Sequence, residues 1–401
     1  MTAVSSAHAA GTAAPRRTVV HGVELVTGGE RTPNAWVRFD GGLVTATGAG
    51  DSWRAHAEAQ GAAAAHTETV DGAGLVLAPG FVDIHVHGGG GAAAEEGAAA
   101  IQRVLDTHLA HGTTRAVISL VTGRPADLLR HLETIAELTA TTPGLLGSHL
   151  EGPFLADEYR GAHDPTMLRS PTPSETAAML EAAGGTLRQI TLAPELAGAG
   201  AAIASFVDAG VAVAVGHTSA SYEQALAAFD AGASILTHTF NGMPGLHHRA
   251  PGPVAAAFRA RHVTLELIND GVHVHPALVE LVFAQASGRV ALITDAMVAA
   301  CAHDGDYMLG SLPVRVEDGV ARLAAGGSIA GSTLTLDAAL RQTVGECGVD
   351  LPTAIRALTE TPAAAIGRSG DLGALAPGYR ADAVLLDASL HVKRVWRDGA
   401  S

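Results

Sequence analysis

Lysine is almost absent from this chain of 401 residues: Lys393, near the C-terminal end, is the single lysine among 25 lysine and arginine residues. Lysine is the residue that forms Schiff bases, carries a bridging carbamate or holds a phosphate as a point charge. Those devices are therefore excluded from the rest of the chain. Positive charge in a functional site must come from arginine, histidine or a metal ion.

Cysteine and long apolar runs are scarce as well. The two cysteines, Cys301 and Cys347, are too few for a disulfide framework, so we expect a reducing, cytoplasmic environment. No apolar run is long enough to span a membrane, and residues 1–15 have neither the basic start nor the compact apolar block of a secretory signal. We interpret residues 1–15 as a disordered tail and expect no membrane partner.

Charge is sparse and mostly negative: 16% of the residues are charged, and the formal net charge is −15. Such a chain is poorly suited to nucleic acid, whose phosphates attract basic surfaces, so no nucleic-acid partner is expected. An anionic small molecule would need locally placed cationic groups to offset the surrounding negative field.

Apolar residues are abundant, at 47%, which is enough for a sizeable core. Across residues 77–371 apolar strand patterns alternate with Ala-rich helical segments, which predicts an α/β fold, namely a (β/α)8 TIM-like barrel. The eight expected strands lie within residues 81–87, 113–122, 145–154, 187–196, 211–219, 233–242, 263–274 and 289–297. The flanking segments 16–76 and 372–401 are strand-like with Gly-rich turns, so both chain ends are expected to form one small β-sandwich domain. A β-hairpin insertion is predicted near 305–327.

His, Asp and Glu residues recur where the expected strands end. They are His85, His87, Glu151, His217, His238, His273 and Asp295. A barrel gathers the carboxyl ends of its strands at one rim, where active sites are built, so we expect these side chains to converge. Taken singly, each has a structural alternative, either a hydrogen-bonded core histidine or a carboxylate that caps the next helix. Their joint placement favours a metal centre.

The ligand types indicate which chemistry such a centre would support. Imidazole and carboxylate ligands without thiolate suit a borderline divalent ion, such as zinc or iron, used for hydrolysis. Such an ion polarises a carbonyl and lowers the pKa of nearby water. Asp295 would accept a proton from that water and later deliver one to a leaving group. Glu151 is placed to bridge two ions.

Eight motifs between Pro79 and Ala338 carry a family resemblance. In chain order they are PGFVDIHVHGGGG, HLEGPF, RGAHDP, VGHTSA, THTFNGMPG, NDGVHV, LITDAM and SIAGSTLTLD. With the terminal GALAPGYRADAVLLD, they make the chain similar to the N-acetylglucosamine-6-phosphate deacetylase family of the amidohydrolase superfamily. The resemblance implies hydrolysis of the acetamido group of N-acetyl-D-glucosamine 6-phosphate, a phosphosugar, to acetate and D-glucosamine 6-phosphate.

The resemblance also implies a role for each matching residue. The metal set would be Glu151, His217 and His238, and His85, His87 and Asp295 would hold a second ion together with Glu151. One or two divalent ions per subunit are therefore expected, with zinc as the first candidate and iron, cobalt or manganese as alternatives. Asp295 would be the catalytic acid and base, and His163 would contact the substrate near its acetamido carbonyl.

Substrate contacts follow in the same way. The matching positions are Ala162, His163, Asn241, Gly242, Arg249, His273, Ile329, Ala330 and Gly331. Arg249 and His273 would bind the phosphate. In the family this arginine can come from the neighbouring subunit, so a homodimer is expected.

Three other functions remain open at this point. The substrate could be N-acetylgalactosamine 6-phosphate, or the chain could be another small-molecule amidohydrolase, such as a D-amino-acid deacylase. A non-catalytic barrel acting as a scaffold belongs to a different class, and it is disfavoured because every metal position holds a competent ligand type.

Overall fold

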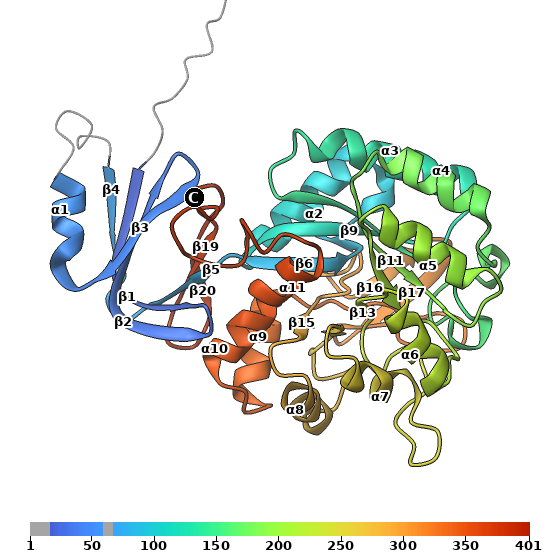
Figure 1. Ribbon diagram of the computed structural model, residues 1–401. Helices are drawn as coiled ribbons and strands as arrows, with labels where there is room; N and C mark the ends of the chain where they lie inside the picture. Colours follow the sequence, from blue (N-terminus) through green and yellow to red (C-terminus); the bar gives the residue numbers. More distant parts are fainter. Residues whose placement is uncertain (1–16, 59–66) are drawn as a thin grey trace, which may run out of the picture.

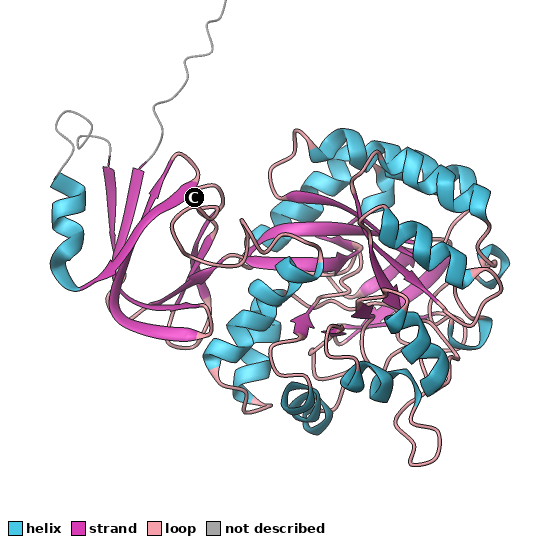
Figure 2. Cartoon of the chain, in the orientation of Figure 1, coloured by secondary structure: helices cyan, strands magenta, loops and turns pink. Residues whose placement is uncertain are grey.

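The computed structural model describes residues 17–58 and 67–401, and the tail predicted at residues 1–15 lies outside this range. Two parts stand side by side, a small β-rich part that contains the C-terminus and a larger part in which helices surround strands (Figures 1 and 2). No helix in the described ranges is long and apolar enough to cross a membrane.

The larger part is a parallel eight-stranded barrel. Its strands are β6 (Phe81–Val86), β9 (Thr113–Val121), β10 (Leu145–Glu151), β11 (Leu187–Leu192), β12 (Ala212–Val215), β13 (Ile235–Leu236), β14 (Thr264–Leu267) and β15 (Val290–Leu292). Each pairs in parallel with the next, in chain order. The predicted (β/α)8 barrel is therefore confirmed.

Helices follow the strands and cover the outside of the barrel (Figure 1). They are α2 (Ala98–Leu109), α3 (Pro125–Thr139), α4 (Pro173–Ala183), α5 (Ala199–Asp208), α6 (Tyr222–Asp230), α7 (Gly252–Arg259), α8 (Pro276–Gln285), α9 (Leu336–Gly345), α10 (Leu351–Leu358) and α11 (Glu360–Ala365). Buried apolar residues of these helices and of the strands join in one large cluster. The strands are buried on both faces, which explains why they read as continuous apolar runs.

First and last strands meet at the rim and close the barrel. Val86 and Ala296 form a parallel bridge. The amide of Asp295 donates to the carbonyl oxygen of His85 at 2.9 Å. The hydroxyl of Thr294 donates to Asp83 Oδ2 at 2.6 Å. Two candidate metal ligands, His85 and Asp295, and residues next to them thus make the closing seam.

The small part is a seven-stranded mixed sheet built from both chain ends. Its strands are β1 (Arg17–Thr27), β2 (Glu30–Asp40), β3 (Leu43–Ala49), β4 (Thr67–Asp71), β5 (Val76–Pro79), β19 (Ala383–Leu386) and β20 (Val392–Trp396). β1, with 11 residues, is long enough to pair with β4 along one half and with β5 along the other. The sheet wraps around its own apolar core, which includes Phe39 and Trp396, and a short helix, α1 (Trp53–Glu58), lies beside it.

Two short antiparallel sheets lie at the rim. The insertion after β15 has three strands, β16 (Gly305–Leu309), β17 (Leu312–Glu317) and β18 (Val320–Leu323). Its apolar side packs on Met297 and Val298, just beyond Asp295. β7 (Gly88–Gly89) pairs with β8 (Ala92–Ala93) directly after the first strand. Both sheets therefore surround the end of the barrel where His87 and Asp295 lie.

Candidate metal centre

The carboxyl ends of the barrel strands direct six ionisable side chains toward one another, those of His85, His87, Glu151, His217, His238 and Asp295. Three of these residues have a left-handed backbone: φ is 46° at His217, 22° at His238 and 48° at Asp295. A non-glycine residue in this region costs about 1–3 kcal/mol and persists only where the surrounding structure holds it. The chain leaves each of these strands in a sharp turn, which directs the side chain over the end of the barrel.

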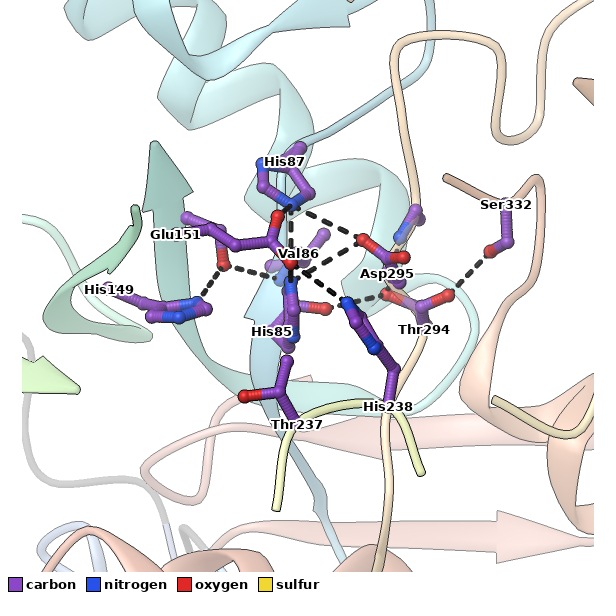
Figure 3. Close-up of polar contacts among 12 residues, drawn as sticks. His85, Val86, His87, His149, Glu151, Thr237, His238, Thr294, Asp295 and Ser332 are labelled. Carbon is purple, nitrogen blue, oxygen red and sulfur yellow. Dashed lines mark hydrogen bonds and ion pairs between the residues drawn. The ribbon is translucent and has the colours of Figure 1, made fainter. Parts of the chain in front are cut away.

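One group of ligand atoms comes from β6, β10 and the loop after β15. His85, His87, Glu151 and Asp295 are all buried, and one ligand atom of each lies within 4.8 Å of the others. His87 Nε2 is 3.2 Å from Glu151 Oε2 and 3.3 Å from Asp295 Oδ1. His85 Nε2 is 3.2 Å from His87 Nε2. Figure 3 shows these four side chains pointing toward one point.

A second group shares Glu151. Its Oε1 atom lies 3.0 Å from His217 Nε2 and 3.0 Å from His238 Nε2, and the two nitrogens are 3.0 Å apart. His163 also approaches Glu151, with Nε2 3.5 Å from Oε2, so Glu151, His163 and His217 form an overlapping set of possible ligands. The shorter and mutually equal distances favour His238 over His163 as the third ligand.

Hydrogen bonds to the backbone decide which ring nitrogens can bind a cation. His217 Nδ1 lies 2.9 Å from the carbonyl oxygen of Tyr159, and His238 Nδ1 lies 3.1 Å from that of Asn241. A carbonyl oxygen only accepts, so both Nδ1 atoms carry the proton and both Nε2 lone pairs face Glu151. Three electron-pair donors around one point fit a divalent cation. His163 has the opposite arrangement, because the Thr122 amide donates to its Nδ1 at 3.4 Å. Its Nε2 therefore carries the proton and can donate a hydrogen bond.

Burial and neighbouring charges shift the pKa values of these groups in different directions. Burial lowers the pKa of His163 to about 4. Burial also opposes the charged form of His87, but Asp295 and Glu151 outweigh it and raise the His87 pKa to about 9. For Asp295, burial raises the pKa, yet the neighbouring His85 and His87 outweigh this and lower it. Asp295 is therefore a carboxylate at neutral pH.

A cavity of about 250 Å³ opens above these ligands. Most of the predicted site residues line it: His87, Glu151, Ala162, His163, His217, His238, Asn241, Gly242, His273, Asp295, Ile329 and Gly331. His85 lies beneath the cavity and Ala330 behind it, both fully buried. His273 is oriented by a hydrogen bond from Nδ1 to Asp270 Oδ2, at 2.7 Å. Arg249 is not brought to the cavity, because it lies on an exposed loop after β13.

A larger hollow, about 820 Å³, is lined by barrel residues such as His262 and Gly288 and by Gly28 and Tyr379 of the small part. None of the potential ligand groups found in the described residues lines it. We therefore place the functional site in the smaller cavity.

Four buried polar residues beneath the ligands were not predicted: Asp83, His149, Gln189 and Glu266. His149 lies two residues before Glu151, but both of its nitrogens are occupied, by Ser119 Oγ at 2.8 Å and Thr191 Oγ1 at 2.9 Å. Glu266 Oε2 lies 3.1 Å from His85 Nδ1. A charged residue inside an apolar strand, as in the sequence TLEL, is the signal that would have identified Glu266.

Comparisons with known proteins agree with this geometry. Residues 76–400 match the amidohydrolase family. The chain is 42% identical over 328 residues to N-acetylgalactosamine-6-phosphate deacetylase of Escherichia coli O157:H7, covering 81% of this chain and 87% of that protein. It is 34% identical over 339 residues to N-acetylglucosamine-6-phosphate deacetylase of Vibrio furnissii, covering 83% and 84%.

Solved structures extend the similarity to nearly the whole chain. A mutant of N-acetyl-D-glucosamine-6-phosphate deacetylase from Mycobacterium smegmatis, in complex with N-acetyl-D-glucosamine-6-phosphate, superposes with a TM-score of 0.89 at 40% identity. The match covers 97% of this chain and 99% of that one. N-acetylglucosamine-6-phosphate deacetylase from Pasteurella multocida gives a TM-score of 0.89 at 26% identity, covering 96% and 98%.

Proposed function

This chain belongs to the amidohydrolase family, and from that premise we propose that it is a metal-dependent deacetylase of N-acetyl-D-glucosamine 6-phosphate. The observation that carries the proposal is the cavity where two groups of buried potential ligands share Glu151, one with His85, His87 and Asp295 and the other with His217 and His238. The hydrogen-bond donor His163 lies beside them. The cavity volume of about 250 Å³ is below the ~300–1,000 Å³ typical of drug-sized ligands, which suits one sugar ring.

We propose zinc as the bound ion, with iron, cobalt and manganese as alternatives. His85, His87, Glu151 and Asp295 would hold one ion, and Glu151, His217 and His238 the other. Bound there, a divalent ion supplies Lewis acidity, which polarises the amide carbonyl and makes water more acidic. Elemental analysis of the purified protein tests both the identity and the number of ions.

The chain's own residues supply the proton transfers and the orientation of the substrate. Asp295, a carboxylate at the rim of the cavity, would take a proton from the attacking water and return one to the departing amine. His163 would donate from Nε2–H to the acetamido oxygen as negative charge develops there. Asn241, Gly242, Ile329 and Gly331 would contact the sugar, and His273, whose Nδ1 is fixed by Asp270, would contact its phosphate through the other ring nitrogen.

Arg249 lies on an exposed loop and does not line the cavity of its own chain. We propose a homodimer in which Arg249 of the partner subunit reaches the substrate phosphate. Light scattering should then give a dimer, and Arg249→Gln should raise KM for the phosphorylated sugar more than it lowers kcat. A monomeric wild-type protein would contradict this arrangement, and so would wild-type kinetics in Arg249→Gln.

The epimer at the sugar C4 is a specific alternative, because the relative from Escherichia coli O157:H7, at 42% identity, is named for N-acetylgalactosamine 6-phosphate. Acetate release should be measured from both 6-phosphates and from unphosphorylated N-acetylglucosamine, with metal-depleted and reconstituted protein. We expect the highest kcat/KM for N-acetyl-D-glucosamine 6-phosphate. A higher value for the galactose epimer would reassign the substrate, and turnover of N-acyl-D-amino acids alone would reject the sugar-phosphate proposal. Protein that binds metal but releases no acetate would indicate a non-catalytic barrel.

A further inference from the structure

Glu266 is a fully buried carboxylate directly beneath the metal centre, on β14. A carboxylate that is removed from water costs several kcal/mol unless hydrogen bonds compensate for it. In the described part of the chain, no arginine or lysine forms an ion pair with it, and its basic partner is His85. Burial of this carboxylate therefore costs free energy of folding, and a purely stabilising role does not explain its position.

The contacts of Glu266 reach both groups of ligands. Its Oε2 atom lies 3.1 Å from His85 Nδ1 and accepts from the backbone amide of His238 at 3.3 Å. Its Oε1 atom accepts from Gln189 Nε2 at 2.6 Å. One side chain thus contacts a ligand of the first group through its ring and a ligand of the second group through its backbone.

We propose that Glu266 is a positioning residue of the metal centre, which keeps the Nε2 lone pair of His85 directed at the ion. The carboxylate can only accept from His85 Nδ1, so Nδ1 carries the proton and Nε2 is available as a ligand. This inference rests on the two-ion centre proposed above and deepens it.

Gln189 gives an independent sign that the carboxylate organises this layer. Its amide oxygen is buried and finds no hydrogen-bond partner among the residues that the structure describes, while its amide nitrogen is directed at Glu266. An unpartnered buried amide oxygen costs about 1–3 kcal/mol. The hydrogen bond from Gln189 to Glu266 offsets this cost, so the carboxylate determines how the amide is oriented.

The two ion sites should respond unequally when Glu266 is changed. The contact with His85 involves the ligand ring itself, whereas the contact with His238 involves only a backbone amide. In Glu266→Leu, His85 Nδ1–H loses its acceptor, and the ring is free to adopt the other tautomer, which turns a proton toward the ion. In Glu266→Gln, the amide oxygen can still accept from His85, so most of the orientation should survive.

Metal titration of the depleted protein tests this inference. Wild-type protein, Glu266→Leu and Glu266→Gln are titrated with Co²⁺ against a chromophoric chelator, and the d–d absorption of each bound ion is recorded. We expect Glu266→Leu to weaken one of two sites by about 10–100-fold, the other site to change less than twofold, and Glu266→Gln to restore most of the loss. Gln189→Leu, a change of similar burial on the far side of Glu266, should keep both affinities.

The possible outcomes separate this inference from the proposed function. If the wild-type protein binds two ions and all variants bind both with unchanged affinity, the role of Glu266 is refuted and the two-ion centre stands. If Glu266→Leu and Gln189→Leu each lower the Co²⁺ affinity of both sites to the same extent, Glu266 is a structural residue and not a positioning residue. If the wild-type protein binds fewer than two ions, the two-ion centre fails, and this inference fails with it. Should Glu266→Leu not fold, equal losses of affinity at both sites in Gln189→Leu would still refute the inference.

Discussion

Gly242→Ala should displace one proposed metal ligand, His217, through a single methyl group. Gly242 has φ of 61°, and a Cβ atom there would lie 2.9 Å from His217 Nδ1 and 3.4 Å from His238 Cε1. Ordinary contacts of a Cβ atom begin at 3.4 Å, so the His217 ring would have to retreat by about 0.5 Å. That movement would disturb the 2.9 Å hydrogen bond from its Nδ1 to the carbonyl oxygen of Tyr159.

The effect of Gly242→Ala has two parts, a backbone cost and the displacement of His217, and a matched variant can separate them. A left-handed alanine costs about 1–2 kcal/mol relative to glycine wherever it occurs. Gly184 ends α4 with φ of 53°. Apart from its two chain neighbours, no described residue has an atom within 4 Å of the position that an added methyl group would occupy, so Gly184→Ala carries this backbone cost alone. Gly242→Ala adds the displacement of His217, and disturbing the support of a ligand typically lowers metal affinity about 10–100-fold.

Chelator competition and urea unfolding of both variants provide the assay. Without metal, Gly242→Ala should lose at least as much free energy of unfolding as Gly184→Ala, and only Gly242→Ala should lose metal affinity. The reasoning would be refuted if Gly242→Ala binds zinc as tightly as the wild-type protein, or if Gly184→Ala loses as much affinity.

Three further predictions address catalysis, pH and thiol exposure. Asp295→Asn should lower kcat for acetate release by about 10²–10⁴-fold while elemental analysis still finds bound metal; a near-normal rate would reject Asp295 as the acid and base. Hydrogen bonds from the His111 ring to Asp337 and Cys301 raise the pKa of His111 to about 10, so its contribution to stability is complete below pH ~6.5 and is lost as the pH rises through about 10. Urea unfolding of wild-type protein and His111→Gln should therefore differ by less than ~1 kcal/mol at pH 6, because the pair is partly exposed, and the difference should vanish above pH 10; a difference that grows with pH would contradict the assignment. An aromatic disulfide reagent should titrate Cys301, which is exposed, in the folded protein and Cys347, which is buried, only after unfolding; two thiols reacting before denaturant is added would show that Cys347 is accessible.

The barrel could be predicted from the sequence because its signals are repetitive and local. Eight apolar runs, separated by helical segments, have one sterically favoured arrangement, and a parallel barrel places all strand ends together. His85, His217 and Asp295 each lie at the end of such a run, so their convergence could be inferred without knowledge of any distance. The wrapped form of the small sheet could not be predicted in the same way, because the pairing of β1 with both β4 and β5 depends on contacts between residues distant in sequence.

The residues that sequence analysis missed share a physical reason. His149 and Glu151 are two residues apart on one strand and look equivalent as ligands, yet hydroxyl groups from neighbouring strands occupy both nitrogens of His149. Which histidine keeps a free lone pair is thus decided by strand neighbours. Arg249 poses the opposite problem, since the resemblance assigned it to the phosphate while its own chain leaves it on an exposed loop.

Because the seam between β6 and β15 lies beside the proposed metal centre, metal binding should report whether the whole barrel has folded. Asp295 and His85, joined there by a backbone hydrogen bond, come from opposite ends of the barrel sequence. A nascent or truncated chain that lacks either residue can therefore assemble only part of the group formed by His85, His87, Glu151 and Asp295. If the chain were cut between Glu151 and His217, each fragment would lack some of the ligands. A divalent cation would then bind tightly only when the two fragments associate into one barrel. Metal uptake should therefore coincide with the last and most cooperative step of assembly.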